Sequence, residues 1–127
     1  MREIILLAAG GALGTVSRYA VSTAATRFFG PGFPVGTLLV NMLGCALLGF
    51  LMYLGLNSHM IPAGLRLAAT VGFLGAFTTF STFSYETVNL IGAGDWHAAM
   101  VNIFANLVFG ATGTLTGLGL GRLFLRM

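Results

Sequence analysis

Apolar residues fill four long segments of this chain, and short polar or helix-breaking stretches separate them. The segments run from about Ile4 to Phe29, from Val35 to Leu56, from Leu65 to Ile91 and from about Ala98 to Phe124. Each exceeds the roughly 20 residues that an α-helix needs to cross a bilayer. The three connections, residues 30–34, 57–62 and 92–97, all contain Gly or Pro. We therefore predict one all-α membrane domain over residues 1–127 with four transmembrane helices.

The third segment departs from a simple membrane helix. Residues 72–83 read Gly-Phe-Leu-Gly-Ala-Phe-Thr-Thr-Phe-Ser-Thr-Phe, and the segment's midpoint falls near Thr78. Gly75 weakens helix continuity, and Thr and Ser side chains compete for backbone carbonyls. We predict a break at the bilayer midplane, where freed backbone groups must be buried in protein or face a water-filled or ion-filled site. The alternative is a Gly/Thr-rich helix-packing face.

Composition supports an integral membrane protein. Hydrophobic residues make up 57% of the chain and charged residues 7%, against about 25% charged residues in an average soluble domain. The net charge of +3 comes from scattered arginines, which are too few for a nucleic-acid-binding surface. His59 and His97 lie in different loops, and no Ser-His-Asp, Cys-His or paired-carboxylate set is evident. The sequence therefore predicts neither an enzyme nor a histidine metal site.

Two polar residues in the first half have two interpretations each. Arg18 follows Ile4 by 14 residues, or about 21 Å of helix. It is either an interfacial arginine with its charge drawn toward water or a cation at the mouth of an anion path. Asn41 is the amide deep in the second segment, where it must face a partner. Its two N–H donors suit an anion and equally suit a bond between helices.

The segment after Thr78 carries aromatic and hydroxyl groups together. Phe80 and Phe83 are one helical turn apart, and their ring edges carry partial positive charge. Such edges can bind a dehydrated anion weakly enough to release it, although core packing is the ordinary role of Phe. Hydroxyl donors surround the same helix at Thr79, Ser81, Thr82 and Ser84. Glu86 lies beside Thr82 and Phe83, where proton coupling and a structural hydrogen bond are both open.

Small residues recur at helical spacing in the outer segments. Gly10, Gly11 and Gly14 form such a face in the first, and Gly113, Gly117 and Gly121 in the fourth. These spacings predict close helix contacts. Asn102 and Asn106 are polar at membrane depth, so we expect them to face the helix bundle or an ion path.

Three of these motifs resemble a known family. Residues 72–83 resemble the third-helix signature of the Fluc fluoride channels, also called CrcB-like proteins, although Ala76 stands where many members have a second glycine. Residues 36–44 resemble the second-helix motif, and Gly10-Gly11-Ala12-Leu13-Gly14 with Ser17-Arg18-Tyr19 resembles the first. The resemblance covers the chain and implies a passive, fluoride-selective channel that releases cytoplasmic fluoride across the bacterial cytoplasmic (inner) membrane.

The resemblance also implies an assembly and a set of site residues. Fluc channels are dual-topology homodimers whose two antiparallel subunits form two pores. The break in the third helix binds a structural Na⁺ through backbone carbonyls, which match Gly75 and Thr78. The pore phenylalanines of the family match Phe80 and Phe83. Its pore asparagine matches Asn41, and its vestibule arginine matches Arg18. For the polar side of the path, Ser81 and Thr82 are the preferred candidates, with Thr79 and Ser84 beside them.

The arginine distribution and two other functions are weighed against this interpretation. If the termini share one side, that side carries Arg2, Arg66, Arg122 and Arg126. The positive-inside rule then favours cytoplasmic termini, whereas dual topology needs a near-even balance. One alternative is a small proton-coupled multidrug exporter of four-helix type, but that class uses a carboxylate deep in its first helix and here Glu3 is at the start. The other is a subunit that does not transport and uses its glycines for assembly alone.

Overall fold

The computed structural model describes all residues, 1–127, and every regular element is a helix. The elements are α1 (Arg2–Phe29), α2 (Val35–Asn57), α3 (Ala63–Leu67), the π-helix η1 (Ala68–Leu74), α4 (Gly75–Phe77), α5 (Phe80–Gly92) and α6 (Trp96–Phe124). Taken together, α3 to α5 make one stretch, so that 4 stretches are long and apolar enough to cross a membrane. The prediction of an all-helical protein with four such segments is confirmed.

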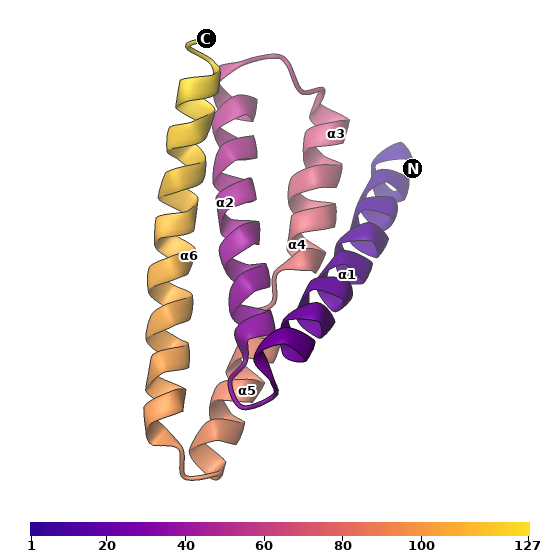
Figure 1. The fold of residues 1–127 in the computed structure, drawn as a ribbon. Helices are drawn as coiled ribbons and strands as arrows, with labels where there is room; N and C mark the ends of the chain where they lie inside the picture. The colour runs from indigo at the N-terminus through magenta and orange to yellow at the C-terminus, as the bar shows by residue number, and fades with distance from the viewer.

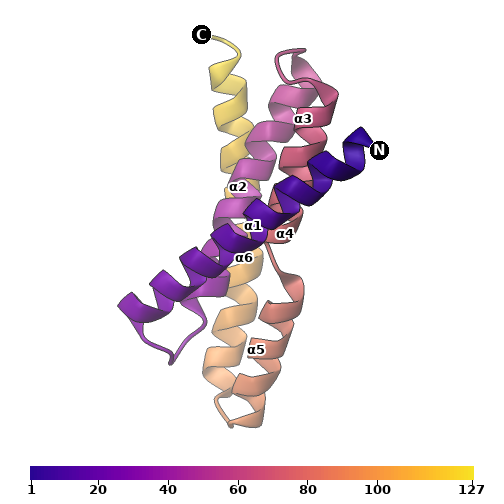
Figure 2. The ribbon, with the colours of Figure 1, turned by 90° about the vertical axis from the view of Figure 1, so that its right-hand side faces the viewer.

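The helices alternate in direction along one long axis. In Figure 1, α2 and α6 run side by side, and the chain from α3 to α5 extends along them in two halves. Both termini and the α2–α3 connection lie toward one end, while the α1–α2 and α5–α6 connections lie toward the other. Figure 2 shows that α1 crosses obliquely over the other helices near the middle of the molecule.

Glycines allow the helices to approach closely at both predicted faces. An added Cβ on Gly117 would overlap the Ala46 carbonyl of α2, and one on Gly113 would lie 2.9 Å from the Met42 oxygen. On α1, a Cβ at Gly10 or Gly14 would collide with the backbone of η1. Both contacts place helix backbone against helix backbone. They confirm the prediction of close contact at these glycines.

The chain between α4 and α5 leaves helical geometry at two residues. Thr78 has φ −81° and ψ 158°, and Thr79 has φ −152° and ψ 114°. This extended linker joins α4 to α5 in Figure 1. Gly75, which we expected to weaken the helix, instead has helical angles of φ −62° and ψ −33°. The departure from helical geometry is therefore at the two threonines and not at the glycine.

Candidate functional site

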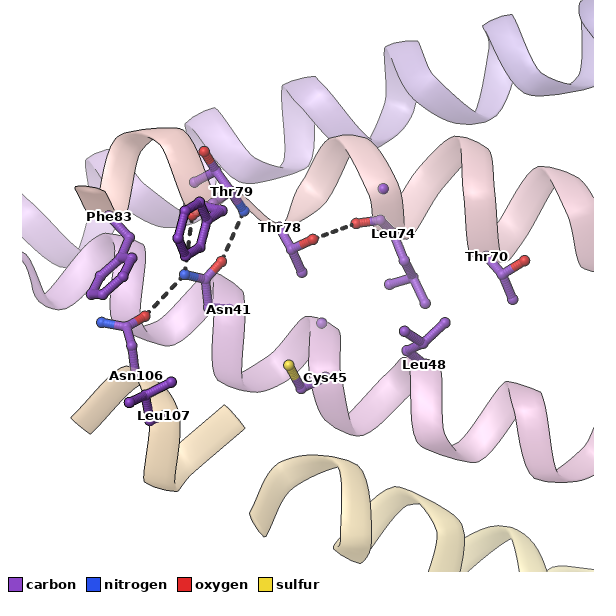
Figure 3. A pocket seen from close by; sticks show the side chains of 13 residues that line it. Asn41, Cys45, Leu48, Thr70, Leu74, Thr78, Thr79, Phe83, Asn106 and Leu107 are labelled. Atoms are coloured by element: carbon purple, nitrogen blue, oxygen red, sulfur yellow. Dashed lines mark hydrogen bonds between the residues drawn. The ribbon is translucent and has the colours of Figure 1, made fainter. Parts of the chain in front are cut away.

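A cavity of about 320 Å³ lies beside the extended linker. Its wall includes six residues singled out from the sequence: Asn41, Gly75, Thr78, Thr79, Phe80 and Phe83. They come from α2, α4, the linker and α5, and α6 contributes Asn106 and Leu107 (Figure 3). The rest of the wall is largely apolar, with Leu48 and Leu74 among its members. The fold therefore gathers residues as distant in sequence as Asn41 and Asn106, which are 65 positions apart, around one cavity.

Asn41 satisfies the backbone of the extended linker. Its Oδ1 accepts the Thr79 N–H at 2.8 Å, and its Nδ2 donates to the Thr79 carbonyl at 3.2 Å. The same Nδ2 donates to Asn106 Oδ1 at 2.9 Å (Figure 3). Buried backbone groups need such partners when they leave the helical ladder. Both N–H groups of Asn41 therefore have protein acceptors, which matches the helix-bonding alternative of the two that the sequence left open.

The side chain of Thr79 caps the N-terminal end of α5. Its Oγ1 accepts the Thr82 N–H at 3.2 Å, donates to Thr82 Oγ1 at 2.9 Å and lies 3.3 Å from Ser81 Oγ. This is the geometry of a threonine N-cap. Three of the four hydroxyl candidates, Thr79, Ser81 and Thr82, therefore form one cluster. Ser84 is half-buried and does not line the cavity beside the linker.

Two carbonyls beside the linker have lost their usual helical donors. In a continuous α-helix the N–H groups of Thr79 and Thr82 would donate to the carbonyls four residues earlier, those of Gly75 and Thr78. Here those N–H groups donate to Asn41 Oδ1 and Thr79 Oγ1 instead. Gly75 is also exposed on the single chain. These two oxygens are thus available to a partner other than their own helix.

The rings of Phe80 and Phe83 sit next to each other on the cavity wall. Their centroids are 5.6 Å apart and their planes are inclined by 56°. Phe80 is 79% exposed, although it occupies the first position of α5, deep within the third membrane-spanning stretch. A ring this exposed in a single chain is free to contact another surface.

A second cavity, of about 300 Å³, is lined mainly by polar side chains. Arg18 and Glu86 both face it, with Thr37, Thr79 and Thr82 among its other lining residues. Thr37 Oγ1 donates to Glu86 Oε1 at 2.8 Å, whereas Glu86 Oε2 is buried without a hydrogen-bond partner. Because Thr79 lines both cavities, this residue lies between the polar cavity and the largely apolar one.

Sequence reasoning missed the partners that join these residues. The bond between Thr37 and Glu86 spans 49 positions and depends on the packing of α5 against α2. Asn102 and Asn106 were expected to face the bundle or a path. They do contact the bundle, since Asn106 bonds to Asn41 and the fully buried Asn102 bonds to Thr87.

Comparison with known proteins identifies the family to which this chain belongs. Residues 5–118 match the family described as CrcB-like protein, Camphor Resistance (CrcB). A Dehalococcoides mccartyi protein named "Fluoride-specific ion channel FluC" is 52% identical over 123 residues, covering 97% of this chain and 95% of the relative. Proteins of the same name from Magnetococcus marinus and Maridesulfovibrio salexigens are 45% and 42% identical, over 95% and 97% of this chain and 98% of each relative. This chain therefore belongs to the CrcB-like family.

Proposed function

We propose that this protein is a fluoride-selective channel that lets cytoplasmic fluoride leave a bacterial cell passively through the cytoplasmic (inner) membrane. The observation that carries the proposal is the similarity, along nearly the whole chain, to proteins named as fluoride-specific channels. The geometry supports it, because the cavity beside the linker is lined by the rings of Phe80 and Phe83 together with threonine hydroxyl groups. Glu3, the one carboxylate of α1, lies in the first turn and not deep in the helix, which disfavours the proton-coupled exporter.

The anion path follows from the two cavities. Arg18 in the polar cavity attracts anions to its mouth by its charge. The Ser81 and Thr82 hydroxyls replace part of the hydration shell of fluoride, and the edges of Phe80 and Phe83 bind the ion weakly enough for it to leave. Asn41 serves this path by holding Thr79 in place, since both of its N–H groups are occupied.

An antiparallel homodimer supplies what one chain lacks. Ser81 and Thr82 are exposed on the single chain, as are Gly75 and Phe80. Polar groups at membrane depth cannot face lipid without a large cost in free energy. A second, inverted copy covers this surface, and the two-fold axis then produces two equivalent pores. Dual topology is the arrangement in which one gene product supplies both orientations.

A structural Na⁺ fits the carbonyls that the helix has released. Hard cations take oxygen ligands, and unwound backbone carbonyls bind Na⁺ in other membrane proteins. No group of three or more His, Cys, Asp or Glu side chains offers an alternative metal site. The Gly75 and Thr78 carbonyls from each subunit would hold the ion and thereby offset their own burial. Replacing Na⁺ with N-methylglucamine should lower the thermal midpoint of the purified protein, and an unchanged midpoint would count against this site.

Fluoride release from liposomes tests the channel and its pore residues together. Purified protein should release trapped fluoride rapidly without a proton gradient, as recorded with a fluoride electrode, and should release little chloride. Phe80→Ile and Phe83→Ile should abolish release, because an aliphatic side chain has no positive ring edge. Phe109→Ile is the matched control, since Phe109 lies on a separate, apolar surface of α6. Full release by both pore variants would remove the aromatic assignment, and trapped fluoride with the unaltered protein would remove the function.

A further inference from the structure

Side chains on three elements form one continuous hydrogen-bond chain around the first turns of α5. It begins where Asn41 holds the Thr79 backbone and continues from Asn41 Nδ2 to Asn106 Oδ1 at 2.9 Å. Asn106 Nδ2 donates to Asn102 Oδ1 at 3.0 Å, and Asn102 Nδ2 donates to Thr87 Oγ1 at 2.9 Å. The chain ends where Thr87 Oγ1 donates to the Phe83 carbonyl at 2.8 Å.

Backbone groups fix the direction of every bond in this chain. The Thr79 N–H can only donate, so Asn41 must turn Oδ1 toward it and Nδ2 toward Asn106. Asn106 must then accept through Oδ1, which leaves Nδ2 to donate to both the carbonyl and Oδ1 of Asn102. Asn102 then donates through Nδ2 to Thr87 Oγ1, and the Thr87 hydroxyl donates its hydrogen to the Phe83 carbonyl. No amide can turn over without leaving two donors or two acceptors facing each other.

The residues of α6 in this chain are poorly placed to donate to an ion. Asn102 is 0% exposed, and the Nδ2 groups of both Asn102 and Asn106 already donate to protein oxygens. Their position gives them a different task. The chain ties Thr79 at one end of the segment and Phe83 at the other to α2 and α6, and Phe80 lies between these two points.

We propose that Asn106, Asn102 and Thr87 are positioning residues that set the placement of the Phe80–Phe83 segment against α2 and α6, and with it the rate of fluoride passage. The inference rests on the proposed channel function. Buried hydrogen bonds that are fully satisfied hold one geometry, because any shift leaves a polar group without a partner. Loss of one link therefore loosens the whole segment and not one contact alone.

An isosteric pair at Thr87 gives the cleanest test. Thr87→Val keeps the shape and removes the hydroxyl, so it should slow fluoride release from liposomes by roughly three- to tenfold. Thr87→Ser keeps the hydroxyl and should release fluoride at close to the unaltered rate. Thr112→Val is the matched control on α6, because the exposed Thr112 hydroxyl bonds only to carbonyls of its own helix. Equal rates for the Val and Ser variants would overturn the inference.

A double-variant comparison then separates a linked chain from local packing. Asn106 and Thr87 are joined through Asn102. If the chain acts as a unit, Asn106→Leu with Thr87→Val should be no slower than Asn106→Leu alone. If the double variant instead shows the product of the two single reductions in release rate, the inference is overturned while the channel function stands. If the unaltered protein does not release fluoride, both proposals fail. If Asn106→Leu does not fold, Asn106→Ser replaces it, and the Thr87 pair still decides the outcome.

Discussion

At the scale of single residues, Thr79 combines several structural roles through its backbone and its side chain. Its N–H and carbonyl are both held by Asn41, its hydroxyl caps α5, and its side chain lines both cavities. It is also buried, at 7% exposure. The extended backbone at this residue can persist in an apolar surrounding because each of its polar groups has a partner.

The cap on α5 leads to a prediction for stability. Thr79→Val keeps the β-branched shape but removes the acceptor for the Thr82 N–H and the bond to the Thr82 hydroxyl. We expect it to destabilise the protein by about 1 kcal/mol, the usual cost of losing an N-cap side chain. Thr79→Ser retains the hydroxyl and is the control. The readout is the thermal midpoint in detergent, and a Val variant as stable as the Ser variant would contradict the capping role.

At the scale of the elements, close backbone contact holds α2 against α6. Gly117 sits on the Ala46 carbonyl and Gly121 on Tyr53 and Phe50, whereas Gly119 has nothing within 4 Å of an added Cβ. The three glycines lie on one helix and differ in their neighbours, which makes them an internal comparison for the value of close packing.

We therefore predict opposite effects for two alanine substitutions in α6. Gly117→Ala forces the backbones apart and should cost about 1–3 kcal/mol, as overpacking usually does. Gly119→Ala meets open space and should be neutral or stabilising, by up to about 1 kcal/mol, because alanine favours the helix. Thermal midpoints of the two variants measured side by side check this. Similar losses for both would mean that packing against Ala46 is not the cause.

The bounds of the helices show how much of the fold could be predicted from the sequence. The spans expected at 4–29, 35–56, 65–91 and 98–124 lie within two residues of the observed helical stretches at each end, since long apolar runs and Gly/Pro connections are local signals. The π-helix Ala68–Leu74 was not foreseen. It packs against α1 at Gly10 and Gly14. The glycine spacing predicted a close contact there, but nothing in it indicated that the contacting segment is a π-helix.

In the candidate site, too, local features could be predicted and contacts between distant segments could not. Asn41, Phe80 and Phe83 were found from residue type and motif, and the structure places them on one cavity. The hydrogen bonds among Asn41, Asn106 and Thr79 could not be predicted, because they depend on the register of α2 against α6 and the linker. The break was expected near Thr78 with Gly75 weakening the helix, but Gly75 is helical and the extended backbone is confined to Thr78 and Thr79, where the Asn41 side chain reaches the Thr79 backbone.

At the scale of the whole molecule, the ends of the bundle differ in charge. The termini and the α2–α3 connection lie toward one end, which carries Arg2, Arg66, Arg122 and Arg126 (Figure 1). Arg66 is also engaged locally, because its guanidinium donates to the Gly55 carbonyl near the C-terminal end of α2. Arg27 lies near the opposite end of the bundle, next to the α1–α2 connection.

Dual topology makes a direct prediction against this bias. In a Cys45→Ala, Met127→Cys variant, a thiol reagent that cannot cross membranes should label roughly half of the molecules in intact cells. Permeabilised cells, in which all molecules should react, are the control. Labelling of all molecules or of none would establish a fixed orientation, and the inverted neighbour would then have to be a different protein.

The most direct test of the central claim is the reversal potential of the current that purified protein carries across a planar bilayer. With a tenfold fluoride gradient and equal pH on both sides, a passive fluoride channel should reverse at about 59 mV, the equilibrium potential of a monovalent ion. Imposing a pH gradient should leave that value unchanged. A reversal potential that moves with pH would contradict the account in favour of proton coupling, and the absence of fluoride current would refute it outright.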